Sequence, residues 1–264
     1  MNIIVFIKQV PDTNEVKIDP VKGTLIRDGV PSIINPDDKH ALEAAITLKE
    51  QHGGIVKVVT MGPPQADIAL REALAMGADE AYLLTDRAFA GADTWATSMT
   101  LSGAVKALGG ADIVLCGHQA IDGDTAQTGP QTAEKLGMVQ LTGASSIKVD
   151  GKKVTITRDI DEGVETVEAE LPVLITAVKT LNDPRFATVA GIVNAFDAEI
   201  TKLSAADMGL DTSLLGTNGS PTSVVKTFTP EPKGKGKMLE GSPAEMVKQL
   251  AAELDEKNIW KAAK

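Results

Sequence analysis

The residues best suited to chemistry lie in one stretch, residues 117–130. They read Gly-His-Gln-Ala-Ile-Asp-Gly-Asp-Thr-Ala-Gln-Thr-Gly-Pro and follow an apolar run at residues 113–116. A helical pattern begins near Thr125 and runs to Leu136, where Gly137 ends it. The pattern therefore predicts a strand, a loop rich in glycine and aspartate, and a helix N-terminus. The free N–H groups of such a terminus attract anions, and small residues let a phosphate approach the backbone.

Two carboxylates in this stretch oppose a phosphate site. Asp122 and Asp124 would repel a phosphate unless their side chains turn away or cap the following helix. An ordinary strand-to-helix turn with an aspartate cap explains the same pattern, so the spacing leaves both interpretations open. His118 is either a ligand contact at the strand end or a solvent-facing loop residue. Cys116 is interpreted as a small core residue, because a Cys/His nucleophile pair needs more than this spacing.

Several common catalytic motifs are absent from the sequence. It contains no glycine-rich dinucleotide fingerprint after a strand, no P-loop and no serine-centred nucleophile elbow. The single cysteine excludes an internal disulfide and a thiolate metal cluster, and no pair among His40, His52 and His118 has zinc-ligand spacing. The chain is therefore predicted to hold a nucleotide through backbone and small polar groups, without acid–base machinery of its own.

The composition limits which binding partners and which cellular compartment are expected. The 264 residues are 43% hydrophobic and 23% charged, as expected of a soluble globular protein with one large or two modest domains. A formal net charge of −10 and an aromatic content of 3% argue against a nucleic-acid partner. No apolar run approaches the roughly 20 residues of a membrane span, and the N-terminus lacks a signal-peptide pattern. We therefore expect no membrane insertion and a cytoplasmic location.

The elements that position the stretch alternate between strands and helices. Strands are predicted at residues 3–7, 55–61, 81–84 and 113–116, with helices that start after Asn35 and at residues 68–76 and 94–108. Asn35 is expected to cap its helix, Pro36 suits the first turn, and Asp37 and Asp38 complement the helix dipole. A short hairpin is possible around Asp28-Gly29. This rhythm predicts a doubly wound, mostly parallel, Rossmann-like α/β sheet with helices on both faces.

The second half of the chain changes character. Residues 147–149 and 154–157 alternate in period two around Asp150-Gly151, which predicts an antiparallel hairpin appended to the parallel sheet. Strands are expected at residues 164–171 and 173–175, whereas residues 192–202 fit either sheet or helix. Residues 209–237 are rich in turns and are predicted to form an extended arm. We expect a nucleotide-binding α/β domain at residues 1–205 and a C-terminal arm and helix at residues 206–264.

The C-terminal helix carries its own signals. Ser242-Pro243-Ala244-Glu245 is a capping box that predicts a helix start. The apolar residues that follow share one stripe of the helix: Val247, Leu250, Ala251 and Leu254. This stripe docks either on its own domain or on a partner subunit.

Several motifs together resemble the beta subunit of electron transfer flavoprotein. The most specific is Ile156-x-Arg158-x-x-Asp161-Glu162-Gly163-x-Glu165-x-Val167, which is followed by Pro172-x-Leu174-Ile175-Thr176. Further matches are Lys8 with Val10-Pro11-Asp12, Asn35-Pro36, residues 73–79, residues 117–122 with 127–129, and residues 181–188. The resemblance is close over residues 1–195 and looser in the C-terminal arm.

The resemblance implies a heterodimer with a flavin-bearing alpha subunit, which exchanges electrons with acyl-CoA dehydrogenases. In the common form the beta subunit holds AMP. The segment near residues 189–194 looks like the part that recognises the dehydrogenase, and the C-terminal helix looks like the arm that wraps the alpha subunit. The positions that match the nucleotide site are Phe6, Asn35, Pro36, Asp37, Asp38, Met61, Gly117, His118, Gln119, Ala120, Ile121, Asp122, Gly123, Asp124, Thr125, Ala126, Gln127 and Thr128.

The loop 122–127, with Pro130 and residues 8–13, is more similar to the electron-bifurcating branch of this family. That branch holds FAD in place of AMP and takes hydride from NADH. One electron goes to ferredoxin or flavodoxin, and the other passes through the alpha-subunit FAD to the dehydrogenase, so catalysis belongs to the flavoprotein complex. The small Gly123 fits a larger ligand, although a glycine also serves a turn. The alternatives are an AMP-binding electron carrier, an ATP-using enzyme on a related fold, and a scaffold for the alpha subunit with an empty pocket.

Overall fold

The computed structural model describes residues 1–12, 31–226, 234 and 236–260. The chain divides into two compact units, residues 1–225 and residues 226–264. The hairpin expected around Asp28-Gly29 lies outside the described residues. The first unit ends twenty residues after the boundary expected at residue 205, because a short helix, α6 (Gly216–Gly219), packs beside the helix α3 (Thr94–Ala107).

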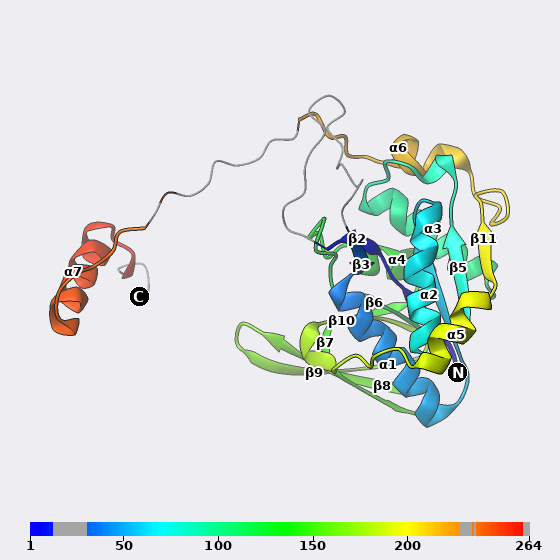
Figure 1. Ribbon diagram of the computed structural model, residues 1–264, viewed down its shortest axis with the longest axis horizontal. Helices are drawn as coiled ribbons and strands as arrows, with labels where there is room; N and C mark the ends of the chain where they lie inside the picture. Colours follow the sequence, from blue (N-terminus) through cyan, green and yellow to red (C-terminus); the bar gives the residue numbers. More distant parts are fainter. Residues whose placement is uncertain (13–30, 227–233, 235, 261–264) are drawn as a thin grey trace. The chain divides into compact units, whose positions relative to one another are not determined.

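A nine-stranded sheet forms the centre of the first unit (Figure 1). From β11 to β7 neighbouring strands run parallel, and β8 and β9 then continue the sheet as an antiparallel hairpin. The predicted fold class is thus confirmed. In spatial order the strands are β11 (Ile200–Leu203), β5 (Glu80–Leu84), β4 (Ile55–Met61), β1 (Asn2–Phe6), β6 (Ile113–Gly117), β10 (Val173–Ala177), β7 (Val139–Asp150), β8 (Lys153–Ile160) and β9 (Gly163–Glu170).

Helices cover both faces of the sheet. Because side chains alternate along a strand, Ile3 of β1 packs into one core with α1 (Pro36–His52) and α2 (Asp67–Met76). Its neighbour Ile4 faces the other core, with α3 and α4 (Thr128–Leu136). Both residues are fully buried, which explains why β1 is a continuous apolar run.

The strand order reverses beside β1. The chain builds β4 and β5 on one side of β1 and then crosses to the other side to form β6. In open α/β sheets, ligands bind at the carboxyl ends of the strands where this reversal occurs. A small two-stranded sheet, β2 (Gln9–Pro11) paired with β3 (Ser32–Ile34), follows β1 directly. The carboxyl ends of β1 and β6 are therefore where a ligand is expected to bind.

Three elements differ in detail from the sequence-based predictions. The helix expected from Thr125 begins at Thr128, because Asp124 and Ala126 adopt left-handed backbone angles that a helix does not admit. β7 begins at Val139, since its first half pairs with β10 before a bend at Gly143, where φ is 71°. The ambiguous region at residues 192–202 contains both α5 (Val189–Asp197) and β11.

Short 3₁₀ turns connect the larger elements at η1 (Pro64–Ala66), η2 (Arg87–Phe89), η3 (Lys179–Leu181) and η4 (Thr212–Leu214). The second unit contains α7 (Pro243–Glu256), and its predicted capping box of Ser242 and Glu245 is confirmed. Val247 and Leu250 on this helix are exposed. None of the described helices is both long and apolar enough to cross a membrane.

Candidate functional site

A cavity of about 1130 Å³ opens at the carboxyl ends of the parallel strands. The ends of β1, β4 and β6 and the loop after β5 contribute to its wall, so it lies where the strand order reverses. Most of the residues predicted for the nucleotide site line it. They are Phe6, Asp38, Met61, Gly117, His118, Gln119, Ala120, Gly123, Asp124, Thr125, Ala126, Gln127 and Thr128.

The other predicted residues, Asn35, Pro36, Asp37, Ile121 and Asp122, do not line the cavity. Asn35 acts from behind the loop. It is fully buried; its Nδ2 donates to the carbonyl of Gln119 at 2.8 Å, and its Oδ1 accepts from the N–H of Ile121 at 3.0 Å. Its side chain does not cap α1, so that prediction was wrong. The amide instead holds both sides of the loop backbone in one geometry.

Asp38 joins the ends of the two central strands. Its Oδ2 accepts from the N–H of Lys8 at 2.8 Å, and its Oδ1 accepts from the N–H of Gly117 at 2.8 Å. Burial raises the pKa of this carboxyl to about 7. A Cβ on residue 117 would lie 2.4 Å from Asp38 Oδ1, so the close approach requires glycine there. Asp38 was expected mainly to complement the helix dipole; its main contacts are these two strand ends.

The two loop carboxylates behave differently. Asp122 turns away from the cavity and accepts from Lys8 Nζ at 2.6 Å, so its charge is paired. Asp124 remains in the cavity wall with a φ of 53°. Of these two, only Asp124 therefore keeps its carboxylate on the path of an anionic ligand.

The backbone from Thr125 to Gly129 can bind an anion. Ala126 has a left-handed φ of 54°, and Gln127 follows with a right-handed φ of −103°. This alternation turns successive N–H groups toward one point and forms an anion-binding nest. No described residue accepts a hydrogen bond from the N–H groups of residues 125–129. A left-handed alanine costs about 1–2 kcal/mol, and strain of this kind is concentrated at functional sites.

His118 and Cys116 offer few reactive or binding groups to the cavity. The backbone N–H of His118 donates to Ala177, and its Nδ1 lies 3.4 Å from Thr176 Oγ1. Cys116 is buried in the core beside the cavity, and burial raises the pKa of its thiol, so it stays protonated. Among the described residues no cluster of three or more histidine, cysteine or carboxylate side chains is arranged to hold a metal.

Sequence reasoning missed the opposite wall of the cavity. This wall contains residues 62–64 and Ala66 after β4, most of residues 85–94 after β5, and Thr222. The available signal was position, because both loops follow the carboxyl ends of parallel strands on one side of β1, namely β4 beside it and β5 one place further. Asp93 organises this wall: its carboxylate caps α3 through the N–H of Ala96 and also accepts from the N–H and hydroxyl of Thr222.

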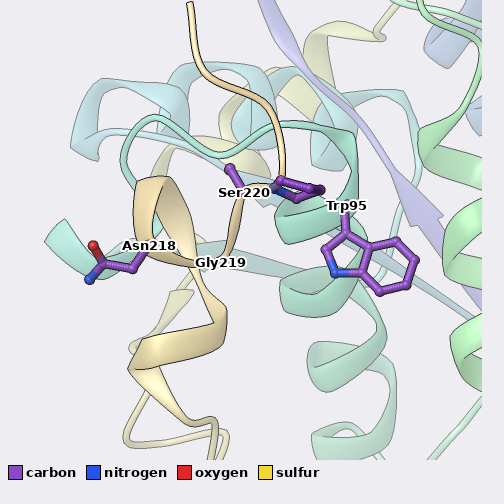
Figure 2. Close-up of a pocket in the computed structure, with 5 residues that line it drawn as sticks. Trp95, Asn218, Gly219 and Ser220 are labelled. Atoms are coloured by element: carbon purple, nitrogen blue, oxygen red, sulfur yellow. The ribbon is translucent and has the colours of Figure 1, made fainter.

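A turn at residues 218–221 supports the same wall from outside. Figure 2 shows this turn beside Trp95, which lies in the first turn of α3. The Nζ of Lys135 on α4 lies 3.3 Å from the centre of the Trp95 ring. Ser220 Oγ accepts from the N–H of Asp93 at 2.8 Å. These contacts thus connect the start of α3 both to the end of α4 and to the segment 218–222, which contains Thr222.

A second feature is an apolar patch around α5. Phe186, Val189, Ile192, Val193 and Phe196 are all exposed. The chain that precedes the patch is held by Arg185, whose guanidinium binds both Glu43 and Glu50 of α1. From α2, Arg71 donates to the carbonyls of Ala195 and Phe196 and so covers the end of α5. Exposed apolar patches with polar supports are typical of protein-binding surfaces.

These features define an α/β protein with a cavity and an anion nest at a strand switch point and a separate apolar surface. Residues 22–208 match the model of the electron transfer flavoprotein domain. The chain belongs to the electron transfer flavoprotein family and is one of its beta subunits. The family is associated with flavin, and its beta subunits pair with an alpha subunit.

Three relatives cover nearly the whole chain. It is 55% identical to the electron transfer flavoprotein subunit beta of Thermoanaerobacterium thermosaccharolyticum, over 98% of this chain and 100% of the relative. It is 54% identical to the caffeyl-CoA reductase-Etf complex subunit CarD of Acetobacterium woodii, again over 98% and 100%. It is 43% identical to the acryloyl-CoA reductase electron transfer subunit gamma of Anaerotignum propionicum, over 98% and 100%.

Proposed function

We propose that this chain is the FAD-holding beta subunit of an electron-bifurcating flavoprotein. In this proposal its FAD takes hydride from NADH. One electron leaves to ferredoxin or flavodoxin, and the other passes through the alpha-subunit FAD to an acyl-CoA dehydrogenase. The residues proposed to bind the cofactor are those of the cavity wall at positions 117–128 together with Phe6, Asp38 and Met61, supported from behind by Asn35.

The observation that carries the proposal is the nest at residues 126–128 opening into a cavity of about 1130 Å³. A typical pocket for a drug-sized ligand has roughly 300–1,000 Å³, so a mononucleotide would leave much of this space unfilled. The space continues from the nest to the loop after β5, as a dinucleotide requires. The size argument does not depend on Gly123, because a Cβ there would meet no atom within 4 Å.

The chain's own groups have distinct roles in this proposal. The nest amides bind a phosphate through the backbone, where no side-chain charge is needed. Asn35 and Asp38 keep the loop and the strand ends in place before the ligand arrives, which lowers the entropy cost of binding. Phe6, Met61 and Leu101 give the cavity an apolar lining that limits access of water. The bound FAD supplies the hydride and one-electron chemistry.

The partner assignments are supported by the surface and by the names of relatives. CarD belongs to a complex with a caffeyl-CoA reductase, and another relative serves an acryloyl-CoA reductase. An acyl-CoA dehydrogenase or a related reductase is therefore the proposed partner of the α5 patch. Residues 206–264 are proposed to form the arm that embraces the alpha subunit, with the exposed stripe of α7 as its contact.

Denaturing the purified alpha–beta complex and identifying the released nucleotides tests the proposal. Two FAD per heterodimer, with rapid bleaching of flavin by NADH in a stopped-flow experiment, are expected. One FAD with one AMP, and no reaction with NADH, would establish the AMP-binding carrier instead. Release of ATP would support the enzyme alternative, and a complex that stays without a nucleotide in this chain after reconstitution would support the scaffold.

A further inference from the structure

We propose that Arg87 selects FAD over AMP in this cavity, by binding a group of the dinucleotide that AMP lacks. The proposal rests on the proposed function and concerns the wall opposite the nest. Arg87 lies in the turn η2, directly after the carboxyl end of β5. It is outside every motif that carried the family resemblance.

The wall of the cavity is poor in available positive charge. Four aspartates line it, and three of them are engaged with the protein's own N–H groups. Asp38 accepts from Lys8 and Gly117, Asp86 from Ala88 and Ala205, and Asp93 from Ala96 and Thr222. Asp124 is the fourth. An anionic ligand therefore needs a cation in this wall as well as the amides of the nest.

Two cationic side chains line the cavity, Lys8 and Arg87. The Nζ of Lys8 is paired with Asp122 at 2.6 Å. The guanidinium of Arg87 has no acceptor among the residues that the structure describes, and the residue is exposed. Arg87 is therefore the cation that can turn to a ligand without breaking an ion pair.

The turn that carries Arg87 is rigidly attached. Asp86 Oδ1 accepts from the N–H of Ala88 at 3.0 Å, and its Oδ2 accepts from the N–H of Ala205 at 3.1 Å. Phe89 is buried in the core on the other side of Arg87. A fixed backbone with an unengaged guanidinium suits recognition, because the planar fork of donors matches phosphate oxygens or a ring carbonyl edge.

The position of η2 separates Arg87 from the nest. In the sheet, β5 is three places from β6, and strand spacing of about 4.8 Å puts their ends roughly 14 Å apart. An arginine side chain does not bridge that distance to a phosphate held in the nest. Arg87 must therefore contact a more distant part of the ligand, which is the second phosphate or the ring system of FAD.

Titrations of the full-length chain with FAD, ADP and AMP test this inference. Arg87→Gln should weaken FAD binding by about tenfold or more, because it removes a charge-assisted contact, and leave AMP binding within about twofold. Arg87→Lys should fall between the wild type and the glutamine variant. Lys202→Gln, which removes an exposed cation of β11 away from the cavity, is the matched control and should change neither affinity.

ADP identifies the group that is contacted. If Arg87→Gln weakens ADP as much as FAD, the contact is the second phosphate; if ADP is unaffected, the contact is the ring system, and both results support the inference. Unchanged FAD affinity would overturn it, as would an equal loss for AMP. If the wild-type chain itself fails to bind FAD, the proposed function fails. If it binds FAD and the glutamine variant binds equally well, the proposed function stands without a role for Arg87.

The nucleotide content of the purified alpha–beta complex gives a second readout. A complex with Arg87→Gln should retain its alpha-subunit FAD and lose FAD from the beta site. Thermal unfolding of the variant should match the wild type, because the exposed side chain makes no hydrogen bond or ion pair with described residues. Wild-type FAD content in the variant complex would contradict the inference.

Discussion

Helix α1 holds two candidate functional segments by different means. At its start, the buried side chains of Asn35 and Asp38 bind the backbone of Lys8, of Gly117 and of the loop after β6. Further along, Glu43 and the exposed Glu50 bind the guanidinium of Arg185, ahead of the apolar patch on α5. One helix therefore serves as the common support for the proposed cofactor site and the proposed docking surface.

The two sets of contacts differ in whether water can replace a lost partner. Asn35 is fully buried and shields its partly buried backbone partners from water, and each such group left without a partner costs about 1–3 kcal/mol. The exposed part of the Arg185 cluster has water and salt as substitutes, and such ion pairs contribute about 0–1 kcal/mol. We infer that the loop contacts fix one geometry, as a phosphate site requires, whereas the docking segment is free to adjust to its partner.

The largest expected effect is that of Asn35→Ala. The change leaves the carbonyl of Gln119 and the N–H of Ile121 without partners, and should lower the free energy of unfolding by about 2–4 kcal/mol. Chemical denaturation measures the loss, and nucleotide content should fall with it. Asn194→Ala, at an exposed position of α5, is the control and should change stability little. A loss below about 0.5 kcal/mol in Asn35→Ala would remove the contrast between the two ends of α1.

The two ends of α1 should also respond to pH in opposite directions. Burial raises the folded-state pKa of Asp38 to about 7, so the folded state binds more protons than the unfolded state between about pH 4 and 7. Its contribution to stability therefore falls as pH rises through that range, by up to about 1.4 kcal/mol per pH unit. Although burial opposes it, hydrogen bonds from Arg185 lower the pKa of Glu43. The contribution of Glu43 is complete above its unfolded-state pKa and is lost as pH falls through the folded-state value.

Unfolding curves at a series of pH values separate these contributions. Asp38→Asn should remove the decline between pH 4 and 7 while lowering stability overall, because the new amide opposes an N–H donor. Glu43→Gln should instead flatten the acid limb below about pH 4.5. Parallel pH profiles for wild type and Asp38→Asn would show that Asp38 does not titrate in this range.

A smaller effect of opposite sign is expected at the nest. Ala126→Gly should raise the stability of the ligand-free chain by up to about 1 kcal/mol, because relief of the left-handed strain outweighs the added freedom of the unfolded chain. Thermal unfolding measures the gain. Ala133→Gly, at a right-handed position of α4, should lower stability by about 1 kcal/mol or more. If both variants lose stability equally, the backbone at residue 126 is not strained.

The smallest effect is expected at the docking end. Glu50→Gln, which removes the exposed partner of Arg185, should lower the free energy of unfolding by about 1 kcal/mol or less, and added salt should reduce the difference from wild type. Nucleotide content should stay at the wild-type level. A loss as large as that of Asn35→Ala would show that the two supports are equivalent.

The fold was predictable because its signals are local. The apolar run of β1, the alternation of strands and helices, and the capping box of Ser242 and Glu245 each depend on neighbouring residues. The true start of α4 was not predictable, because residues 125–127 have the composition of a first helical turn and only the tertiary loop holds Ala126 left-handed. Local sequence patterns indicate helix propensity, and the tertiary structure of this loop outweighs that propensity.

The site was predictable on one side. The loop after β6 carried recognisable glycines and aspartates, so most of its residues were placed correctly in the cavity wall. The role of Asn35 was misjudged because its partners, at Gln119 and Ile121, are more than eighty positions away. Arg87 and Thr222 carry no motif: the arrangement of the sheet brings Arg87 to the cavity, and hydrogen bonds with Asp93 hold Thr222 there.

The bonds between Asp93 and Thr222 have a mechanical consequence. Thr222 forms part of the cavity wall, and the first compact unit ends only a few residues later, at Val225. A pull on the chain after Val225 would therefore act on the hydrogen bonds between Thr222 and Asp93 before it acted on the sheet. In the proposed function, the embrace of the alpha subunit by the tail and the binding of the nucleotide would therefore both depend on a single carboxylate at the start of α3.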